Sequence, residues 1–141
     1  MGEDRGPIIF VCVQNAGRSQ MAEAFARSQG LEAISAGTVP SKAPNPLVIE
    51  LMREKGHDLS AKKPRMLTSQ MIESASLVVT MGCSVESACP KPMLAMMQKK
   101  LIDWDLPDPK GKPAAEVRII RDEIEKRVRE LSMSRQWASE P

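Results

Sequence analysis

The chain has 141 residues, 42% of them hydrophobic and 27% charged, with a formal net charge of +2, which is typical of one globular domain that buries its own core. Basic and acidic residues are mixed along the chain, and two Phe, two Trp and no Tyr offer little to stack on bases, so we expect no nucleic-acid partner. No apolar run approaches the ~20 residues that span a bilayer, and the start MGEDRG does not resemble a signal peptide, so we expect a cytoplasmic protein without a membrane anchor.

The first half of the chain alternates between strand and helix patterns. Residues 8–13 (IIFVCV) form a continuous apolar run that predicts a strand buried on both faces. Residues 17–29 predict a helix that Gly30 ends, and residues 31–35 predict a short second strand. Residues 46–55 predict a second helix with a proline in its first turn.

The second half continues the alternation. Residues 68–75 predict a short helix capped by Thr68, and residues 77–81 (LVVTM) predict a third buried strand. Residues 82–100 are irregular in pattern and rich in Pro and Met, and residues 101–104 predict a short fourth strand.

The last predicted helix covers residues 114–133, where apolar residues recur at helical spacing. We expect residues 135–141 to form a frayed tail behind a core of about residues 7–133. The whole chain, residues 1–141, is interpreted as a single domain.

Strands separated by helices predict a parallel sheet with right-handed crossovers. The fold class is therefore α/β: a small doubly wound four-stranded parallel sheet in the order 2-1-3-4, flanked by helices. In such sheets a ligand binds beyond the carboxyl ends of the strands, where the strand order reverses. The loop after the first strand is thus the expected position of a site.

That loop carries the pattern C-x5-R-S, from Cys12 to Ser19. A tight loop leading into a helix turns backbone N–H groups inward and forms an anion-binding nest. Asn15 and Gly17 tolerate the positive φ that such a loop needs, and Arg18 offers a planar fork that matches two oxyanion oxygens. The expected oxyanion-binding residues are Val13, Gln14, Asn15, Ala16, Gly17 and Arg18.

The same surroundings favour the thiolate of Cys12 as a nucleophile. A helix N-terminus and a nearby guanidinium both stabilise the ionised sulfur, and Ser19 is placed to donate a hydrogen bond to it. The alternative is a buried core cysteine at a strand end. Because the strand, the C-x5-R-S pattern and the helix follow one another directly in the sequence, we favour the interpretation of Cys12 as a nucleophile.

The C-x5-R-S pattern after an apolar strand, followed by QMAEA, resembles the low-molecular-weight tyrosine phosphatase superfamily. The run RSQMAEAF, with Ser35-Ala36-Gly37 downstream, resembles its arsenate reductase branch more closely. The resemblance covers residues 8 to about 131. It implies a phosphatase-like fold and the reduction of arsenate to arsenite.

In that branch three cysteines act in turn, and the resemblance implies these roles for Cys12, Cys83 and Cys89. Cys12 attacks arsenate, Cys83 attacks Cys12 and releases arsenite, and Cys89 attacks Cys83 to leave a disulfide that external thioredoxin reduces. No tightly bound cofactor is implied. C-x5-C is poor zinc spacing and the chain has one His, His57, so we expect no metal. The alternative to the relay is that Cys83 and Cys89 are incidental small hydrophobic residues.

Some relatives also bind a monovalent cation near the loop. Asn15, Glu23 and Ser35 fall at the matching positions, but residues 59–70 lack the matching acidic residue.

The stretch WDLPDP, residues 104–109, resembles the acid-bearing loop of the superfamily, whose aspartate precedes proline. The resemblance assigns protonation of the leaving oxygen to Asp108, with Asp105 as the substitute and an ordinary turn as the alternative. Lys110-Gly111-Lys112 follows where tyrosine phosphatases of this fold carry aromatic residues. That difference favours a small inorganic substrate.

Two other functions stay open. A low-molecular-weight phosphotyrosine or aryl phosphatase would need Cys12, Arg18 and Asp108 but neither Cys83 nor Cys89, since arsenate and phosphate share shape and charge. A non-catalytic oxyanion-binding or redox-sensing module is the third possibility. We expect a monomer whose partners are an arsenate- or phosphate-like oxyanion and thioredoxin, with glutathione and glutaredoxin as the alternative reductants.

Overall fold

The computed structural model describes residues 6–81 and 101–139, with side chains up to residue 134. Its elements in chain order are β1 (Ile8–Cys12), α1 (Arg18–Ser28), β2 (Ala33–Gly37), α2 (Pro46–Arg53), α3 (Ser69–Ser74), β3 (Leu77–Thr80), β4 (Leu101–Asp103) and α6 (Ala114–Ser139). The four strands form one parallel sheet in the order β2-β1-β3-β4, which confirms the predicted fold class and strand order.

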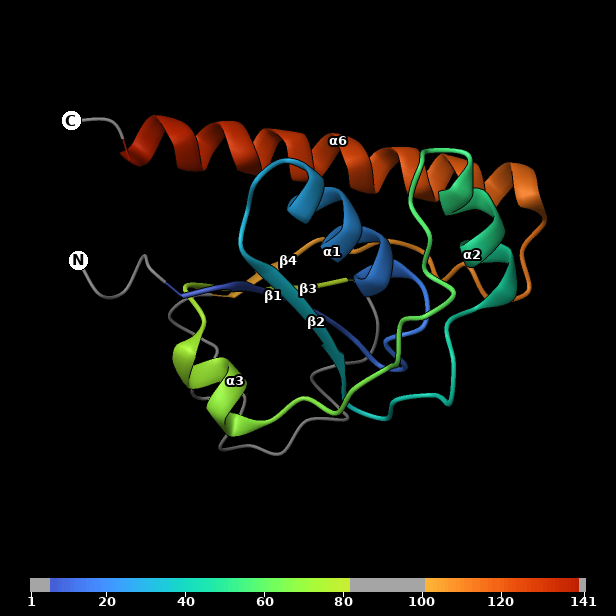
Figure 1. Cartoon of the computed structure of the whole chain (residues 1–141), viewed down its shortest axis with the longest axis horizontal. Helices are drawn as coiled ribbons and strands as arrows, with labels where there is room; N and C mark the ends of the chain where they lie inside the picture. Colours follow the sequence, from blue (N-terminus) through green and yellow to red (C-terminus); the bar gives the residue numbers. More distant parts are fainter. Residues whose placement is uncertain (1–5, 82–100, 140–141) are drawn as a thin grey trace.

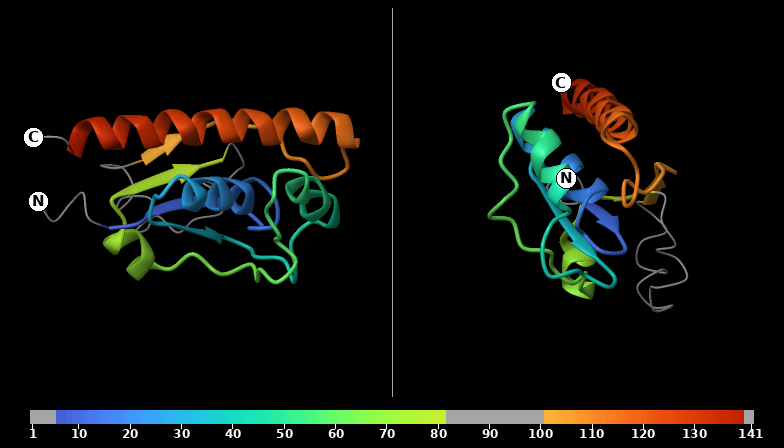
Figure 2. Two further views of the ribbon diagram at one scale, coloured as in Figure 1. Left: turned by 45° about the horizontal axis from the view of Figure 1, so that its top comes forward. Right: turned by 90° about the vertical axis from the view of Figure 1, so that its right-hand side faces the viewer.

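Helices cover both faces of this sheet (Figure 1), with α1, α2 and α6 on one face and α3 on the other (Figure 2). Side chains of β1 alternate between the two faces. Phe10 and Cys12 point into the larger core under α1 and α6, whereas Ile9 and Val11 point into the smaller core beside α3. The apolar run is therefore buried on both faces, as predicted.

Strand β2 and helix α6 depart most from their predicted bounds, and each of the other elements agrees with its prediction to within two residues at either end. Strand β2 begins at Ala33 instead of residue 31, because the Leu31 N–H still donates to the Ala26 carbonyl (3.0 Å) in the turn that ends α1 at Gly30 (φ 83°). Helix α6 runs to Ser139, so the frayed tail is wrong for residues 135–139. Residues 134–139 (SRQWAS) contain no Gly or Pro to stop a helix.

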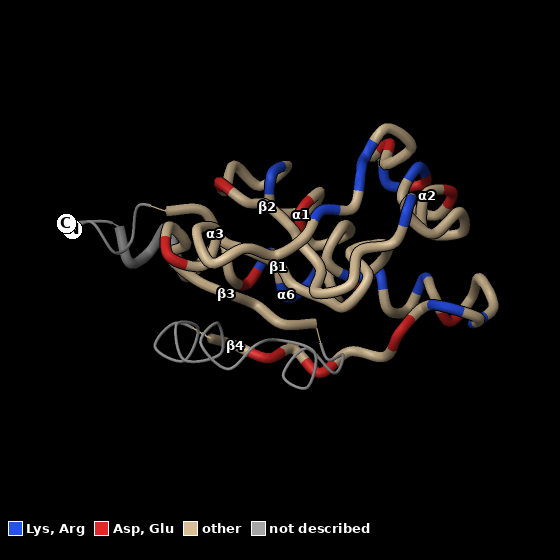
Figure 3. Tube along the Cα trace, turned by 90° about the horizontal axis from the view of Figure 1, so that it is seen from below, with Lys and Arg blue, Asp and Glu red and all other residues tan. Residues whose placement is uncertain are grey.

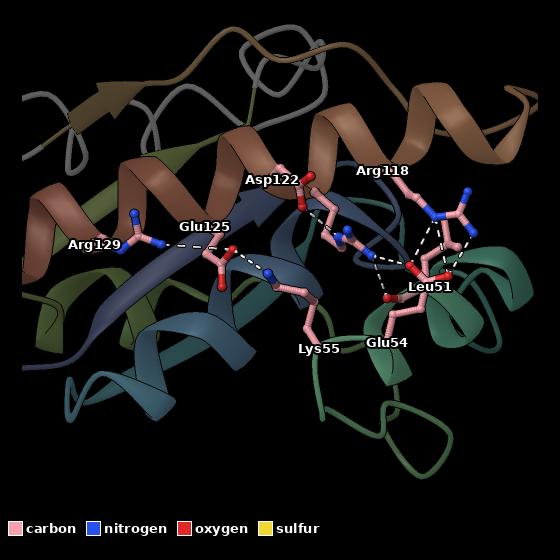
Figure 4. Close-up of polar contacts among 8 residues, drawn as sticks. Leu51, Glu54, Lys55, Arg118, Asp122, Glu125 and Arg129 are labelled. Atoms are coloured by element: carbon pink, nitrogen blue, oxygen red, sulfur yellow. Dashed lines mark hydrogen bonds and ion pairs between the residues drawn. The ribbon is translucent and has the colours of Figure 1, made fainter.

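Ion pairs fasten α2 to α6 (Figure 4). The Glu54 carboxylate accepts hydrogen bonds from Arg118 Nη2 (2.7 Å) and from Arg121 Nη1 (2.7 Å). The Arg118 hydrogen bond, followed by that of Arg121, lowers the pKa of Glu54 from 4.5 to about 2. Arg121 Nη1 also donates to the Leu51 carbonyl (3.0 Å). The network thus holds the C-terminal end of α2, the helix whose first turn lines the cleft described below.

Charged residues of both signs lie around α2, whereas the chain that leaves β4 is acidic (Figure 3). It carries Asp103, Asp105 and Asp108 before its first basic residue, Lys110. In the part of the chain that the structure describes, no helix is long and apolar enough to span a membrane.

Candidate active site

A cleft of about 980 Å³ opens where β1 ends and α1 begins. Its base is the loop of residues 12–18, here named the thiol loop. One wall is formed by residues 41 and 43–46, and the other by residues 105–110, which include most of the acid loop (residues 104–109). A cleft beyond the carboxyl end of β1 is where the sheet topology predicts the site.

Cys12 lies at the base of this cleft and is 3% exposed. Its Sγ lies 2.9 Å from Ser19 Oγ, in the first turn of α1, as predicted. Asn15 Nδ2 donates to the same hydroxyl oxygen at 2.8 Å. Because Asn15 occupies an acceptor position of Ser19, the hydroxyl proton is available to Cys12, and only Ser19 can donate once the thiol is ionised.

Asn15 is the residue around which the thiol loop is built. It is fully buried and has the positive φ that was predicted, 52°. Its Oδ1 accepts hydrogen bonds from the Arg65 N–H (3.0 Å) and from Gln20 Nε2 (3.3 Å). The side chain therefore connects the loop after α2 to Ser19, and through it to Cys12. Sequence reasoning did not find the contribution of Arg65, which is made through its backbone.

Two glycines lie at points of close packing beside the cleft. Gly17 has φ −138°, so the prediction of a positive φ is wrong for it. A Cβ at Gly17 would instead lie 3.0 Å from Pro109 Cγ, across the cleft in the acid loop. A Cβ at Gly37, at the end of β2, would lie 2.6 Å from the Val13 carbonyl oxygen. Gly37 thus lets the thiol loop approach β2, a role that its sequence position alone does not reveal.

Arg18 joins the two sides of the cleft. Its Nη1 donates to the carbonyls of Leu106 (2.7 Å) and Met81 (3.1 Å), and the residue is 5% exposed. Its Nη2 lies 3.8 Å from Asp108 Oδ2. Since Nη1 is occupied by two carbonyls, an oxyanion would be bound through Nε and Nη2. The fork therefore also fixes the acid loop, which was not predicted.

Asp108 lies in the wall of the cleft formed by residues 105–110, and its side chain is 60% exposed. Its Oδ1 accepts a hydrogen bond from the Lys110 N–H (3.0 Å), and its Oδ2 faces Arg18. Asp105 also lines the cleft and has a positive φ of 23°. Both residues thus line the same cleft as Cys12, and Asp108 is the one whose carboxylate is paired with Arg18.

Of the expected oxyanion-binding residues, five line the cleft and the sixth, Asn15, lies behind the loop with its side chain in the hydrogen bonds described above. The five are Val13, Gln14, Ala16, Gly17 and Arg18. The Ala16 carbonyl accepts a hydrogen bond from the Asn45 N–H (2.8 Å). Asn45 is the N-cap of α2, so that helix supports the loop from outside.

Glu23 and Ser35, two of the possible cation ligands, do meet in the structure. Ser35 Oγ donates to Glu23 Oε1 (2.7 Å), and Lys62 Nζ donates to Glu23 Oε2 (3.0 Å). Arg27 Nε lies 3.5 Å from the same Oε2. The buried carboxylate is thus already neutralised by cationic side chains of this chain.

Cys83 and Cys89 lie outside the described residues, so their roles stay predictions. Within residues 6–81 and 101–134, no group of three or more His, Cys, Asp or Glu side chains could hold a metal ion.

Comparison with known proteins gives a consistent result. The family model for low molecular weight phosphotyrosine protein phosphatase matches residues 7–139. A curated relative from Halobacterium salinarum is 42% identical over 130 residues, which are 86% of this chain and 87% of that protein. Arsenate reductase 1 of Staphylococcus haemolyticus is 34% identical over 131 residues, covering 91% of this chain and 96% of the relative.

Solved structures are similar over the same span. The YwlE arginine phosphatase from Geobacillus stearothermophilus superposes with a TM-score of 0.84 at 25% identity, covering 94% of each chain. A thioredoxin-dependent arsenate reductase of Corynebacterium glutamicum superposes with a TM-score of 0.74 at 36% identity, covering 95% of this chain and 63% of that one. The fold is thus shared by phosphatases and arsenate reductases.

Proposed function

Because the chain belongs to the low molecular weight phosphotyrosine protein phosphatase family, and its curated relatives include arsenate reductases, we propose that it reduces arsenate to arsenite. The observation that carries the proposal is the buried Cys12 thiol, 2.9 Å from Ser19 Oγ, at the base of a cleft that Arg18 also lines. A thiol held in this way is suited to attack a tetrahedral oxyanion.

In the first step, Cys12 Sγ attacks arsenic and an As–O bond breaks. Asp108 gives its proton to the departing oxygen, which leaves as water. Arg18 binds two of the remaining oxygens through Nε and Nη2, and the backbone N–H groups of the thiol loop bind the negative charge. The product is an arsenic atom bonded to Cys12 Sγ. The short Ser19 contact and the position of Arg18 beside Asp108 support this step.

In the second step, the Cys83 thiolate attacks Cys12 Sγ. An S–S bond forms as the S–As bond breaks, and the electron pair of that bond stays on arsenic, which leaves as arsenite. Cys89 then attacks Cys83, forms a Cys83–Cys89 disulfide and returns Cys12 as a thiolate. Thioredoxin supplies two electrons to that disulfide by thiol–disulfide exchange. Support for this part comes from the sequence pattern and from the thioredoxin-dependent relative.

We also infer that the enzyme works as a monomer in the cytoplasm, where thiols are kept reduced and Cys83–Cys89 can be recycled. Size-exclusion chromatography with light scattering tests the monomer. Replacing thioredoxin by glutathione and glutaredoxin in the activity assay tests the reductant.

A phosphatase is the second candidate function, and two observations favour it. The structural similarity to an arginine phosphatase extends over 94% of the chain. The cleft of about 980 Å³ is of a size that holds much larger ligands than a single oxyanion. Such an enzyme would use Cys12, Arg18 and Asp108 with water in place of Cys83.

Parallel assays on one preparation separate these functions. Arsenate-dependent NADPH consumption with thioredoxin and thioredoxin reductase is measured beside hydrolysis of 4-nitrophenyl phosphate, for the wild type, Cys12→Ser and Cys83→Ser. A reductase loses NADPH consumption in both variants. Hydrolysis without arsenate reduction, unaffected in Cys83→Ser, would instead establish the phosphatase.

A further inference from the structure

The acid loop is held at two points by two guanidinium groups that come from different sides of the molecule. Arg18 Nη1 donates to the Leu106 carbonyl at 2.7 Å from within the cleft. Arg127 Nη1, on α6, donates to the Trp104 carbonyl at 2.6 Å. A charged donor on a carbonyl forms one of the stronger hydrogen bonds in proteins. Arg127 therefore fixes the first residue of this loop from outside the cleft.

Arg127 is itself oriented by its own helix. Its Nε donates to Glu123 Oε2 at 2.7 Å, one turn earlier, and its side chain is 34% exposed. Helix α6 runs along the sheet past β4 (Figure 2), and its docking is provided by buried apolar residues such as Ile124 and Val128. The helix is thus docked by its apolar face, and the guanidinium of Arg127 adds a contact with the acid loop at Trp104.

The point that Arg127 holds is where the chain turns toward the cleft. Asp105 follows at once, with a φ of 23° that costs energy in a non-glycine residue and persists only when its surroundings impose it. The Trp104 N–H donates to the Thr80 carbonyl at 2.8 Å, so both backbone polar groups of Trp104 are fixed. Together these bonds impose the turn.

Asp108 depends on that turn for its position. Its carboxylate is 60% exposed and contacts the Lys110 N–H at 3.0 Å and Arg18 Nη2 at 3.8 Å. These contacts are too few to fix the carboxyl group, so its position in the cleft that Cys12 also lines follows from the path of the loop backbone. A displacement of about 1 Å at a catalytic group can reduce the rate up to 10²-fold.

We propose that Arg127 is a positioning residue, which holds the Trp104 carbonyl and thereby places the carboxyl group of Asp108 over the leaving oxygen. The proposal rests on the proposed function in one respect, the assignment of Asp108 as the general acid. Arg127 itself touches neither the substrate nor the reacting atoms.

The test compares the first-turnover rate of arsenite formation in Arg127→Met and in the wild type. We expect a loss of about tenfold in rate, within the range of a misplaced catalytic group, with KM for arsenate changed less than twofold. Alkylation of Cys12 by iodoacetamide should keep the wild-type rate, since the thiol loop is untouched. Arg127→Lys retains one donor and should recover part of the loss.

Two further variants make the test specific: a control substitution on the same helix, and Arg127→Met combined with Asp108→Asn. Arg129→Met removes an arginine of the same helix whose ion pair with Glu125 spans 4.0 Å, and it should behave as the wild type. In an Asp108→Asn background, Arg127→Met should add less than a twofold loss, because the group that it positions is already absent. A wild-type rate in Arg127→Met, or an equal tenfold loss in both backgrounds, would overturn the proposal.

The experiment separates failure of the proposed arsenate reductase function from failure of the proposed role of Arg127. If the wild type forms no arsenite, the same variants are compared on phenyl phosphate and 4-nitrophenyl phosphate. A misplaced acid slows release of phenol more than release of the better leaving group 4-nitrophenol. A larger loss on phenyl phosphate would support the positioning role of Arg127, and equal losses or none would overturn it.

Discussion

The hydrogen bond from Ser19 to Cys12 predicts a measurable change in the reactivity of the thiol when it is removed. Ser19→Ala deletes a contact of 2.9 Å to Cys12 Sγ, and because Cys12 is a buried residue, 3% exposed, water cannot easily replace the lost donor. Asn15 Nδ2, which donates to Ser19 Oγ at 2.8 Å, would lose its acceptor as well. The thiolate is therefore destabilised relative to the thiol.

The size of the change follows from the charge on the acceptor. A hydrogen bond to a charged group contributes about 1.5–3 kcal/mol, and about 1.4 kcal/mol corresponds to one pH unit. The midpoint of the pH–rate profile for alkylation of Cys12 should rise by roughly 1–2 pH units in Ser19→Ala. At a pH below both midpoints the rate should fall about 10- to 100-fold, and well above them it should equal that of the wild type.

The assay is iodoacetamide modification across a range of pH, with the Cys12 peptide quantified by mass spectrometry so that Cys83 and Cys89 do not interfere. Ser28→Ala is the matched control, because this serine also lies on α1 but donates to the Phe25 carbonyl (2.7 Å). Ser19→Thr keeps a hydroxyl and should retain most of the effect. An unchanged midpoint in Ser19→Ala would refute the activation argument.

Three further predictions concern the cleft and its supports. In Gly17→Ala, the new Cβ would lie 3.0 Å from Pro109 Cγ, so Pro109 and the acid loop must move slightly. We expect a several-fold lower turnover with little change in Tm. An unchanged turnover would contradict the packing argument. Arg18→Lys keeps the charge but loses the planar fork and its carbonyl contacts, so the arsenate reduction rate should fall by about 100-fold or more; a loss under threefold would show that the fork is unnecessary. Glu54 has a pKa of about 2 in the folded protein instead of 4.5, so the unfolded state binds more protons in that window and stability should fall as the pH drops from 4.5 toward 2. Thermal unfolding against pH should show a shallower fall for Glu54→Gln, and parallel curves would refute the contribution of this carboxylate.

The elements that the sequence predicts well are those whose cause is local. The apolar run of β1 and the pattern C-x5-R-S lie within a dozen residues, so the strand, the loop and the start of α1 follow from them. The contact between Cys12 and Ser19 could be anticipated for the same reason. The strand order also followed, since alternating strands and helices leave few permitted arrangements.

The features that escaped prediction depend on residues far apart in the chain. Asn15 is supported by the backbone of Arg65, and Gly37 is required by the approach of Val13. Gly17 was expected to provide a positive φ, but its φ is negative and Pro109 packs closely against it. A backbone donor leaves no residue-type signal, and a glycine does not show which distant segment approaches it, so local pattern could not reveal these contacts.

The proposed reduction of arsenate depends on a disulfide relay from Cys12 through Cys83 to Cys89, and the Cys89→Ser variant isolates the last step of that relay. Arsenite is counted per chain, first without reductant and then with thioredoxin, thioredoxin reductase and NADPH. Without reductant, we expect about one arsenite per chain for both the wild type and Cys89→Ser, because reduction of one arsenate consumes two thiols. With thioredoxin the wild type should turn over many times, whereas Cys89→Ser should stay near one. Sustained turnover of Cys89→Ser at the wild-type rate would contradict the relay.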